Sequence, residues 1–151
     1  DEHCDKNKHL GKLNLIGDGF HNIIDGLILI SAFSVDIKFG WSILLAIALH
    51  EIVQEIGDFG ILLYAGYTKS KALIYNFISA STILIGVILG YFLINNINNI
   101  NIFLLPFAAG GFIYIATSDI IPELHKEINF KKSFLSFVFF VLGLVIMYNL
   151  T

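Results

Sequence analysis

The sequence predicts an all-α, polytopic membrane protein, a transmembrane bundle of about five spanning helices. Hydrophobic residues make up 56% of the 151 residues, whereas charged residues make up only 14%, and the mean hydropathy is +0.79. A soluble globular chain carries about 25% charged residues, so these charges are too few to cover a water-exposed surface. The same excess of apolar residues excludes intrinsic disorder.

Each predicted helix has about the 20 mostly apolar residues that a membrane span needs. The five stretches are residues 13–35, 40–66, 72–95, 102–121 and 133–150. The first is the least apolar because acids and a histidine lie inside it. The fourth contains Pro106 in its first turns, where a proline is tolerated best. Residues 1–12 are left as a cytoplasmic tail, and no separate soluble domain is expected beside the membrane domain 13–151.

The third stretch carries polar side chains that we expect to hydrogen-bond neighbouring helices, because lipid offers them no other partner. These residues are Asn76, Ser79, Ser81 and Thr82.

The lysines agree with this division, because positive residues concentrate in cytoplasmic loops. If the five helices alternate in direction, eight of the nine lysines fall on one side, and only Lys38 falls on the other. The N-terminus of the chain is therefore predicted to be cytoplasmic and the C-terminus external. We favour a plasma or inner membrane over an organelle.

The charge and cysteine content exclude some functions. The net charge is −3 and the basic residues form no clustered face, so no nucleic-acid partner is expected. Cys4 is the single cysteine, which excludes an intrachain disulfide framework. The chain begins with Asp1 rather than methionine, and we interpret it as a piece of a longer protein.

Ionisable residues inside the first two stretches point to function, because such residues are costly in lipid and usually functional. In the first stretch the polar residues fall within an arc of roughly 100° on one helix face: Asp18, His21, Asn22 and Asp25. In the second they cover roughly 140°: His50, Glu51, Gln54, Glu55 and Asp58. The two helices are antiparallel neighbours with their polar residues near mid-span, so the two polar faces can meet.

A divalent cation would resolve the repulsion among these carboxylates, because it binds their deprotonated form. The pairs His21/Asp25 and His50/Gln54, four residues apart, can each bind one metal from one helix turn. The pairs Asn22/Asp25 and Glu51/Gln54 can serve a second, more oxygen-rich position, and Asp25 could bridge the two. The alternative is a polar seam that only joins two helices by hydrogen bonds.

At these residues the chain resembles the ZIP family of divalent-metal transporters, in its LIV-1-like branch. Residues 21–26 match the family motif HNxxDG, residues 50–58 are similar to HExPHExGD, and residues 108–123 are similar to AAGxFLYVATxDxxPE. The chain departs from the second motif at Val53, which replaces a proline, and at Gln54, which replaces a histidine. Glutamine is a weaker, neutral ligand, so the affinity or the choice of metal is expected to differ.

The resemblance implies transport of a divalent cation toward the cytosol, with Zn²⁺ favoured and Fe²⁺, Mn²⁺ or Cd²⁺ as alternatives. It implies that the chain supplies the last five of eight spanning helices, so three N-terminal helices of the parent protein are missing. A homodimer in the lipid bilayer is left open.

By the same resemblance, a paired metal centre lies between the first two helices. The first position is assigned to His21, Asp25, His50 and Gln54. The second is assigned to Asn22, Asp25, Glu51 and Gln54. Glu55 and Asp58 are expected just outside the ligand shell, along the pathway or against another helix. Asp18, Asp119 and Glu123 are expected just outside the ligand shell, along the exit path, or in solvated or packed positions.

Two other functions remain open at the level of sequence. The first is a membrane metal sensor or a transport-inactive fragment, which would use the same ligands without flux. The second is an intramembrane metalloprotease, because His50-Glu51 begins an HExxH-like segment. A zincin needs the second histidine of that motif as a ligand, and Gln54 stands in its place, so this alternative is the weaker one. We therefore expect a transporter and not an enzyme.

Overall fold

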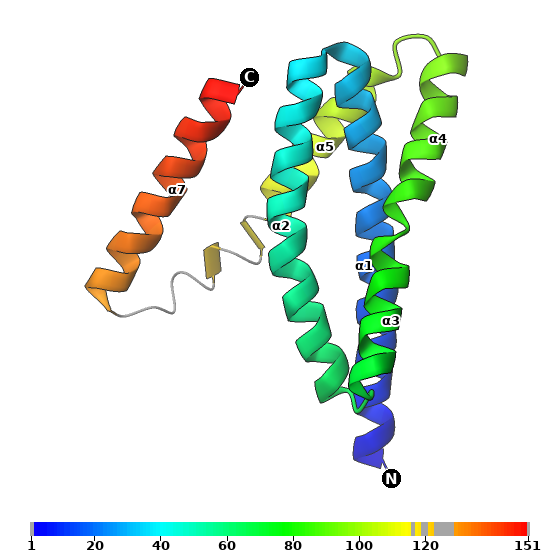
Figure 1. Cartoon of the computed structure of the whole chain (residues 1–151), viewed down its shortest axis with the longest axis vertical. Helices are drawn as coiled ribbons and strands as arrows, with labels where there is room; N and C mark the ends of the chain where they lie inside the picture. Colours follow the sequence, from blue (N-terminus) through cyan, green and yellow to red (C-terminus); the bar gives the residue numbers. More distant parts are fainter. Residues whose placement is uncertain (1, 116, 119–120, 123–128, 151) are drawn as a thin grey trace.

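The computed structural model describes residues 2–115, 117–118, 121–122 and 129–150, and these are helical apart from short connections. Figure 1 shows a long helical hairpin, α1 and α2, with the consecutive helices α3 and α4 beside it and the helices α5 and α7 farther along the chain. The helices are α1 Glu2–Val35, α2 Ile37–Tyr64, α3 Lys69–Ala80, α4 Ile83–Asn96, α5 Asn101–Ile115 and α7 Phe130–Leu150. The described part of the chain contains no strand, so the all-α prediction is confirmed.

The α1–α2 hairpin turns at a single residue, Asp36. Its backbone is extended, and its carboxylate accepts hydrogen bonds from the backbone N–H groups of Lys38 (2.8 Å) and Phe39 (3.0 Å). This N-cap supplies an acceptor for two helix-end donors that would otherwise have none. The short turn makes α1 and α2 antiparallel neighbours, as expected from the sequence.

The first helix is longer than predicted, because residues 2–12, expected as a tail, are helical. Gly11 explains how this extension packs. A methyl group at Gly11 would lie 2.9 Å from the side chains of Ala65 and Tyr67. The N-terminal part of α1 thus lies against the end of α2, where only glycine leaves enough room.

The third predicted helix is broken into α3 and α4 at Ser81 and Thr82. Around this point the backbone makes short i→i+3 hydrogen bonds, from Thr82 N to the Ser79 carbonyl (3.0 Å) and from Leu84 N to the Ser81 carbonyl (3.1 Å). The segment nevertheless remains long and apolar enough to cross a membrane. Three such segments are found among the described residues: Lys8–Val35, Ile37–Tyr64 and Lys69–Asn96.

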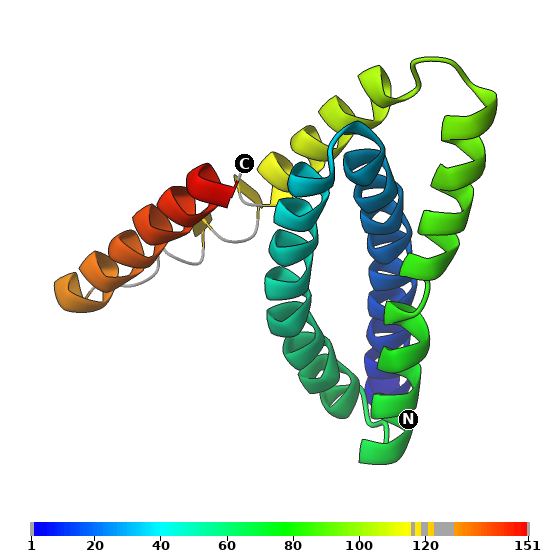
Figure 2. The same cartoon turned by 45° about the horizontal axis from the view of Figure 1, so that its top comes forward.

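The remaining helices, α5 and α7, contact different helices of the hairpin. Helix α5 packs against α1, and Asn101 at its start donates a hydrogen bond to the Ser34 hydroxyl (2.8 Å). Helix α7 approaches α2 but stands apart from the other helices in both views (Figures 1 and 2). The predicted fourth span, 102–121, is helical through Ile115, and its last residues are only partly described.

Polar side chains are buried and many large apolar side chains are exposed, which is the reverse of the pattern in a soluble protein. Asp25 and Asn22 are each 1% exposed, whereas Val53 is 72% exposed and Phe77 is 74% exposed. Exposed apolar area on this scale marks a surface that meets something other than water, and a bilayer places apolar side chains outward. The chain is an integral, multi-pass membrane protein.

Candidate metal centre

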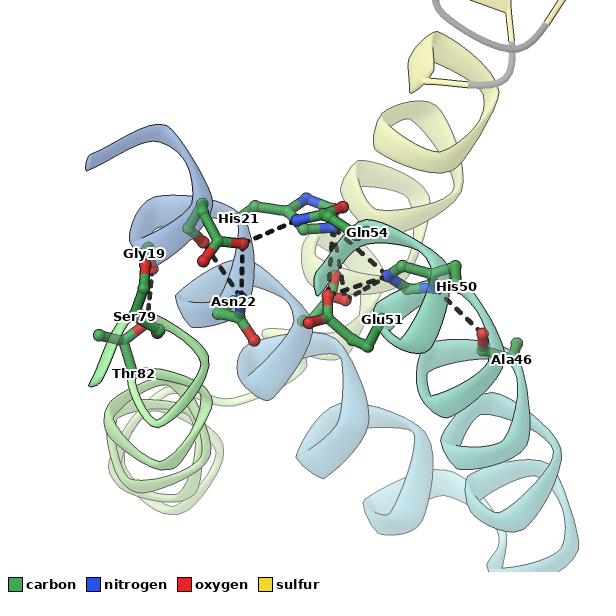
Figure 3. Close-up of polar contacts among 11 residues, drawn as sticks. Gly19, His21, Asn22, Ala46, His50, Glu51, Gln54, Ser79 and Thr82 are labelled. Carbon is green, nitrogen blue, oxygen red and sulfur yellow. Dashed lines mark hydrogen bonds and ion pairs between the residues drawn. The ribbon is translucent and has the colours of Figure 1, made fainter. Parts of the chain in front are cut away.

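Four side chains that could hold a metal ion come together between α1 and α2, and Figure 3 shows three of them, His21, His50 and Glu51. The four are His21, Asp25, His50 and Glu51, and each offers a ligand atom within 4.8 Å of the others. His21 and Asp25 stand one turn apart on α1 and therefore share a face. His50 and Glu51 are consecutive on α2, and both side chains reach the same point.

The spacing of these atoms suits a tetrahedral zinc ion. His50 Nε2 lies 2.9 Å from Asp25 Oδ2, 3.3 Å from Glu51 Oε1 and 3.3 Å from His21 Nε2. His21 Nε2 lies 3.7 Å from both Asp25 Oδ2 and Glu51 Oε1. Ligands about 2.0–2.2 Å from a tetrahedral Zn²⁺ lie roughly 3.3–3.6 Å from one another. The four side chains thus need little movement to surround one cation.

His50 is oriented by its own helix. Its Nδ1 lies 3.0 Å from the Ala46 carbonyl oxygen, one turn earlier on α2. That carbonyl can only accept, so Nδ1 donates a hydrogen bond to it, and Nε2 is the nitrogen that faces Asp25 and Glu51 and would bind a metal. A metal-binding histidine commonly has its second nitrogen fixed in this way.

A second group of acids lies beside the first, toward the N-terminal end of α1. Asp18, Glu51 and Glu55 place carboxylate oxygens within 4.8 Å of one another. Glu51 belongs to both groups. The expected bridging of two metal positions by Asp25 stays a prediction. Burial raises the cost of keeping three close carboxylates ionised, and a cation between them would relieve it.

Asp18 is held by amides from both helices. Asn22 Nδ2 donates to Asp18 Oδ1 (3.1 Å) and to the Asp18 carbonyl (3.2 Å), and Gln54 Nε2 donates to the same Oδ1 (2.8 Å). Sequence reasoning assigned Asn22 and Gln54 as ligands and Asp18 as an exit-path residue. The structure brings all three together, with the amide nitrogens directed at Asp18. The four-residue spacing of Asp18 and Asn22 is a sequence signal for the contact within α1, whereas the contact with Gln54 depends on how the two helices face each other.

The remaining site residues lie farther along the same groove or outside the described chain. Asp58 is 8% exposed, lies beside Asn14 and Asp18, and is separate from the four-residue centre. Sequence reasoning did not single out Asn14, although it stands one turn before Asp18. Asp119 and Glu123 lie outside the described residues, so their predicted place on an exit path stays a prediction.

Three of the four polar residues predicted to bond neighbouring helices do so; they lie on α3 and at its junction with α4. Asn76 Nδ2 donates to the Glu55 carbonyl (3.0 Å), Ser79 to the Leu15 carbonyl (2.9 Å) and Thr82 to the Gly19 carbonyl (2.7 Å). The prediction was wrong for Ser81, whose hydroxyl bonds the Phe77 carbonyl of its own helix (2.6 Å). These bonds fix α3 and α4 against the two helices that carry the metal ligands.

Comparison with known proteins agrees with the family resemblance of the sequence motifs. The family model described as "ZIP Zinc transporter" matches residues 1–151. The chain is 43% identical over 130 residues to the uncharacterized zinc transporter P8A3.03 of Schizosaccharomyces pombe, covering 80% of this chain and 28% of that protein. It is 40% identical over 122 residues to zinc transporter ZIP10 of Mus musculus, covering 77% and 15%.

A plant relative extends over more of the chain. IAA-alanine resistance protein 1 of Arabidopsis thaliana is 40% identical over 137 residues, covering 89% of this chain and 29% of that protein. The chain therefore spans less than a third of the length of these curated relatives. No solved structure gives a significant match.

Proposed function

The chain belongs to the ZIP zinc transporter family, and from this premise we propose that it carries a divalent cation, with Zn²⁺ favoured, across the membrane toward the cytoplasm. The cation would be bound between α1 and α2 by His21, Asp25, His50 and Glu51. The observation that supports this site most strongly is the spacing of their four ligand atoms, 2.9–3.7 Å for the distances given above.

The ligand chemistry suits transport better than storage. Two imidazoles and two carboxylates bind zinc firmly enough to replace part of its hydration shell. A transport site must also release its ion, whereas a closed four-cysteine site is typical of permanent structural zinc. The same ligands accept Fe²⁺ and Mn²⁺, so these ions remain alternative cargo. Asn22 and Gln54 remain proposed second-position ligands through their amide oxygens.

The lysines and the acids support the proposed orientation and direction of transport. The lysine-bearing ends, Lys8 and Lys12 on α1 and Lys69 and Lys71 at the α2–α3 turn, are the proposed cytoplasmic side. The carboxylates beyond the centre continue toward that side. A cation released in that direction meets the carboxylates of Asp18, Glu55 and Asp58 after it leaves the centre, which supports delivery toward the cytoplasm.

Family membership argues against the protease alternative, because the family consists of transporters. Gln54, which stands where a zincin would need its second histidine, bonds Asp18. A metal sensor remains the competing function, because it would use the same ligands.

Zinc flux into proteoliposomes tests the proposal. We would compare the full-length protein made by the cell with its His50→Ala and Asp25→Asn variants. Matched controls are His9→Ala and Asp36→Asn, which make the same chemical changes outside the centre. We expect each site variant to reduce the initial rate at least tenfold, because loss of even an outer-shell partner costs about 10–100-fold, and the controls to keep it.

Two results would contradict the proposal. Unchanged flux in both site variants would place the transport pathway elsewhere. Zinc binding that depends on His50, without flux in the wild-type protein, would support the sensor instead. Parallel measurements on the 151-residue chain would show whether it moves zinc without the rest of the protein.

A further inference from the structure

A pocket rich in positive charge lies where the N-terminal part of α1 meets the end of α2 and the start of α3. These parts of the three helices lie together in Figure 1, near the N-terminus. We call this the basic pocket. It has a volume of about 200 Å³, and its lining includes Lys8, Tyr67, Thr68, Lys71 and Tyr75. At about 30 Å³ per water molecule, this volume has room for a phosphate group.

The charges of the basic pocket come from two helices and have no counter-charge. Lys8 of α1 and Lys71 of α3 are both exposed, and Lys12 and Lys69 lie within four residues of them in the sequence. Among the described side chains, none of these lysines forms an ion pair, because the ion pairs found there all involve histidine. The pocket therefore attracts an anion.

The start of α3 adds to this positive potential. Helix α3 has two lysines, Lys69 and Lys71, and no acid in its first turn. The N-terminus of a helix carries a partial positive charge, so these lysines have the unfavourable sign for their position. The backbone N–H groups of Lys69 and Ser70 have no hydrogen-bond acceptor among the described residues. An anion in the pocket would offset both charges.

A second pocket, which we call the apolar groove, continues from the basic pocket between α1 and the α3–α4 segment. It has a volume of about 350 Å³, and its lining includes Leu15, Phe20 and Ile23 of α1 and Tyr75 and Ile78 of α3. Tyr75 lines both pockets, so the two spaces adjoin at this side chain.

The polar groups of the apolar groove already have partners. Ser79 and Thr82 line the groove, but their hydroxyls donate to the carbonyls of Leu15 (2.9 Å) and Gly19 (2.7 Å). Figure 3 shows both side chains meeting α1 near Gly19. The groove thus offers mainly apolar contacts, which suit a hydrocarbon chain.

The two pockets together have the depth of one lipid leaflet. Lys71, Tyr75, Ser79 and Thr82 follow one another at steps of three or four residues and share a face of the α3–α4 segment. Eleven residues separate Lys71 from Thr82, which corresponds to about 16 Å along a helix. Half of the hydrocarbon core of a bilayer is about 15 Å thick.

We propose that the basic pocket and the apolar groove together bind one anionic phospholipid, with its phosphate group beside Lys8 and Lys71 and an acyl chain along the groove. Basic pockets between transmembrane helices on the cytoplasmic side are suited to anionic head groups. Soluble phosphate would use the basic pocket alone. A helix from the rest of the parent protein would fill the groove but leave the lysines without a counter-charge. The proposal goes beyond the metal centre and does not depend on the transported ion.

Native mass spectrometry of the full-length protein in detergent tests this site, because a bound lipid adds its own mass to the protein. The probes are phosphatidylglycerol, phosphatidylcholine with the same acyl chains, and inorganic phosphate as a competitor. The variants are Lys8→Gln and Lys71→Gln. Lys131→Gln is the matched control, because it makes the same change at the start of α7, outside both pockets.

We expect one phosphatidylglycerol to bind more tightly than phosphatidylcholine. Its affinity should fall about fivefold in Lys8→Gln and in Lys71→Gln, which is the contribution of one lysine near an anionic surface. The affinity should be unchanged in Lys131→Gln, and inorganic phosphate should not displace the lipid.

A second pair of variants tests the apolar groove. Ile78 and Ile74 are 57% and 56% exposed on the same helix, but only Ile78 lines the groove. Ile78→Trp fills the groove and should weaken phosphatidylglycerol binding, whereas Ile74→Trp should leave it unchanged. Elution of each variant as a single species checks that it has folded.

Three results would overturn the proposal. Wild-type affinity in both lysine variants would exclude the basic pocket. Displacement of the lipid by inorganic phosphate, with equal binding in Ile78→Trp and Ile74→Trp, would assign the pocket to soluble phosphate. Absence of a bound phosphatidylglycerol on the wild-type protein would mean that another part of the parent protein covers the groove. None of these results bears on zinc flux, so failure of the transport proposal is distinguishable from failure of this one.

Discussion

Gln54 makes a contact in the structure that its sequence position does not indicate. In the motif it occupies the place of a histidine ligand, yet its amide nitrogen donates to Asp18 Oδ1 across the α1–α2 interface. Asn22 donates to the same oxygen from α1. Hydrogen-bond donors of this kind orient a carboxylate for metal binding. The Gln54 amide also links α2 to α1, because it bonds the Asp18 carboxylate that Asn22 holds from α1.

Replacement of Gln54 by alanine tests this role. We expect Gln54→Ala to weaken Zn²⁺ binding by about 10–100-fold, because Asp18 loses one of its two amide donors and the amide oxygen is lost as a ligand. Isothermal titration in nanodiscs measures the affinity. Asn95→Ala is the control, since it removes an amide that bonds only the exposed Tyr91 carbonyl of its own helix. Equal affinity in the two variants would show that Gln54 contributes nothing to the centre.

At the scale of helices, α1 and α4 approach so closely that two glycines are required. A methyl group at Gly26 would lie 2.1 Å from the Ile83 carbonyl oxygen, and one at Gly86 would lie 2.0 Å from the Ile23 carbonyl oxygen. Both obstacles are backbone atoms, which cannot rotate away. Small residues permit such contact between helices in lipid, and here the contact includes Gly26, the residue after Asp25.

Gly86→Ala is therefore expected to lower stability by about 1–3 kcal/mol or more, because added volume must push two backbones apart. The midpoint of thermal unfolding in detergent measures the effect. Gly60→Ala is the matched control, because a methyl group there meets nothing within 4 Å in the described structure. Its stability should be unchanged or slightly higher, since alanine restricts the unfolded chain. Similar midpoints for the two variants would contradict the close packing.

The break between α3 and α4 is fixed by one threonine hydroxyl. Thr82 Oγ1 lies 2.7 Å from the Gly19 carbonyl of α1 and 2.7 Å from the Ser79 carbonyl of its own chain segment. A hydroxyl has one proton to donate, so it is shared between these two acceptors. The break therefore lies where it can bond the turn of α1 that carries Asp18.

Thr82→Val keeps the shape of the side chain and removes this donor. We expect a loss of about 0.6 kcal/mol, and at most about 1.7, which is the range for single hydrogen bonds between helices in membranes. Ser81→Ala is the control, because the Ser81 hydroxyl bonds only within its own helix. Thermal unfolding of the two variants in parallel compares their losses of stability. If Ser81→Ala is as destabilising as Thr82→Val, the contact with α1 adds no stability.

At the scale of the whole molecule, apolar side chains face outward and polar side chains face the α1–α2 interface. This arrangement follows from lipid as the surrounding solvent, because a charged group is stable there only when it faces other polar groups or water. The lysines then decide which end of the bundle meets the cytoplasm. They predict opposite sides for the α2–α3 turn and the segment between α4 and α5.

Labelling of introduced cysteines tests this orientation. On a Cys4→Ser background, Lys69→Cys and Asn98→Cys would be treated with a membrane-impermeant maleimide on intact cells. We expect Asn98→Cys to react from outside and Lys69→Cys to react only after the membrane is permeabilised. Labelling of Lys69→Cys on intact cells would reverse the predicted orientation and with it the proposed direction of transport.

The sequence by itself determined the class of molecule, because composition and the length of apolar stretches depend only on the solvent that surrounds the chain. It also predicted which residues are candidate metal ligands, because a helix repeats every 3.6 residues and places His21 with Asp25 wherever the helix lies. The family resemblance came from the same local motifs. These properties are local, and local spacing is what a sequence records directly.

Only the tertiary structure decided how the two polar faces combine. The distance from His50 Nε2 to Asp25 Oδ2, the sharing of Glu51 between two groups and the amide contacts on Asp18 all depend on the rotation of α2 relative to α1. The break at Ser81 and Thr82 likewise depends on carbonyl groups of α1 about 63 residues away in the chain. Such features arise from contacts between helices, and the relative position of two helices is set by side-chain packing over their whole interface. The residue pattern of one helix therefore does not determine how the neighbouring helix is rotated or shifted against it.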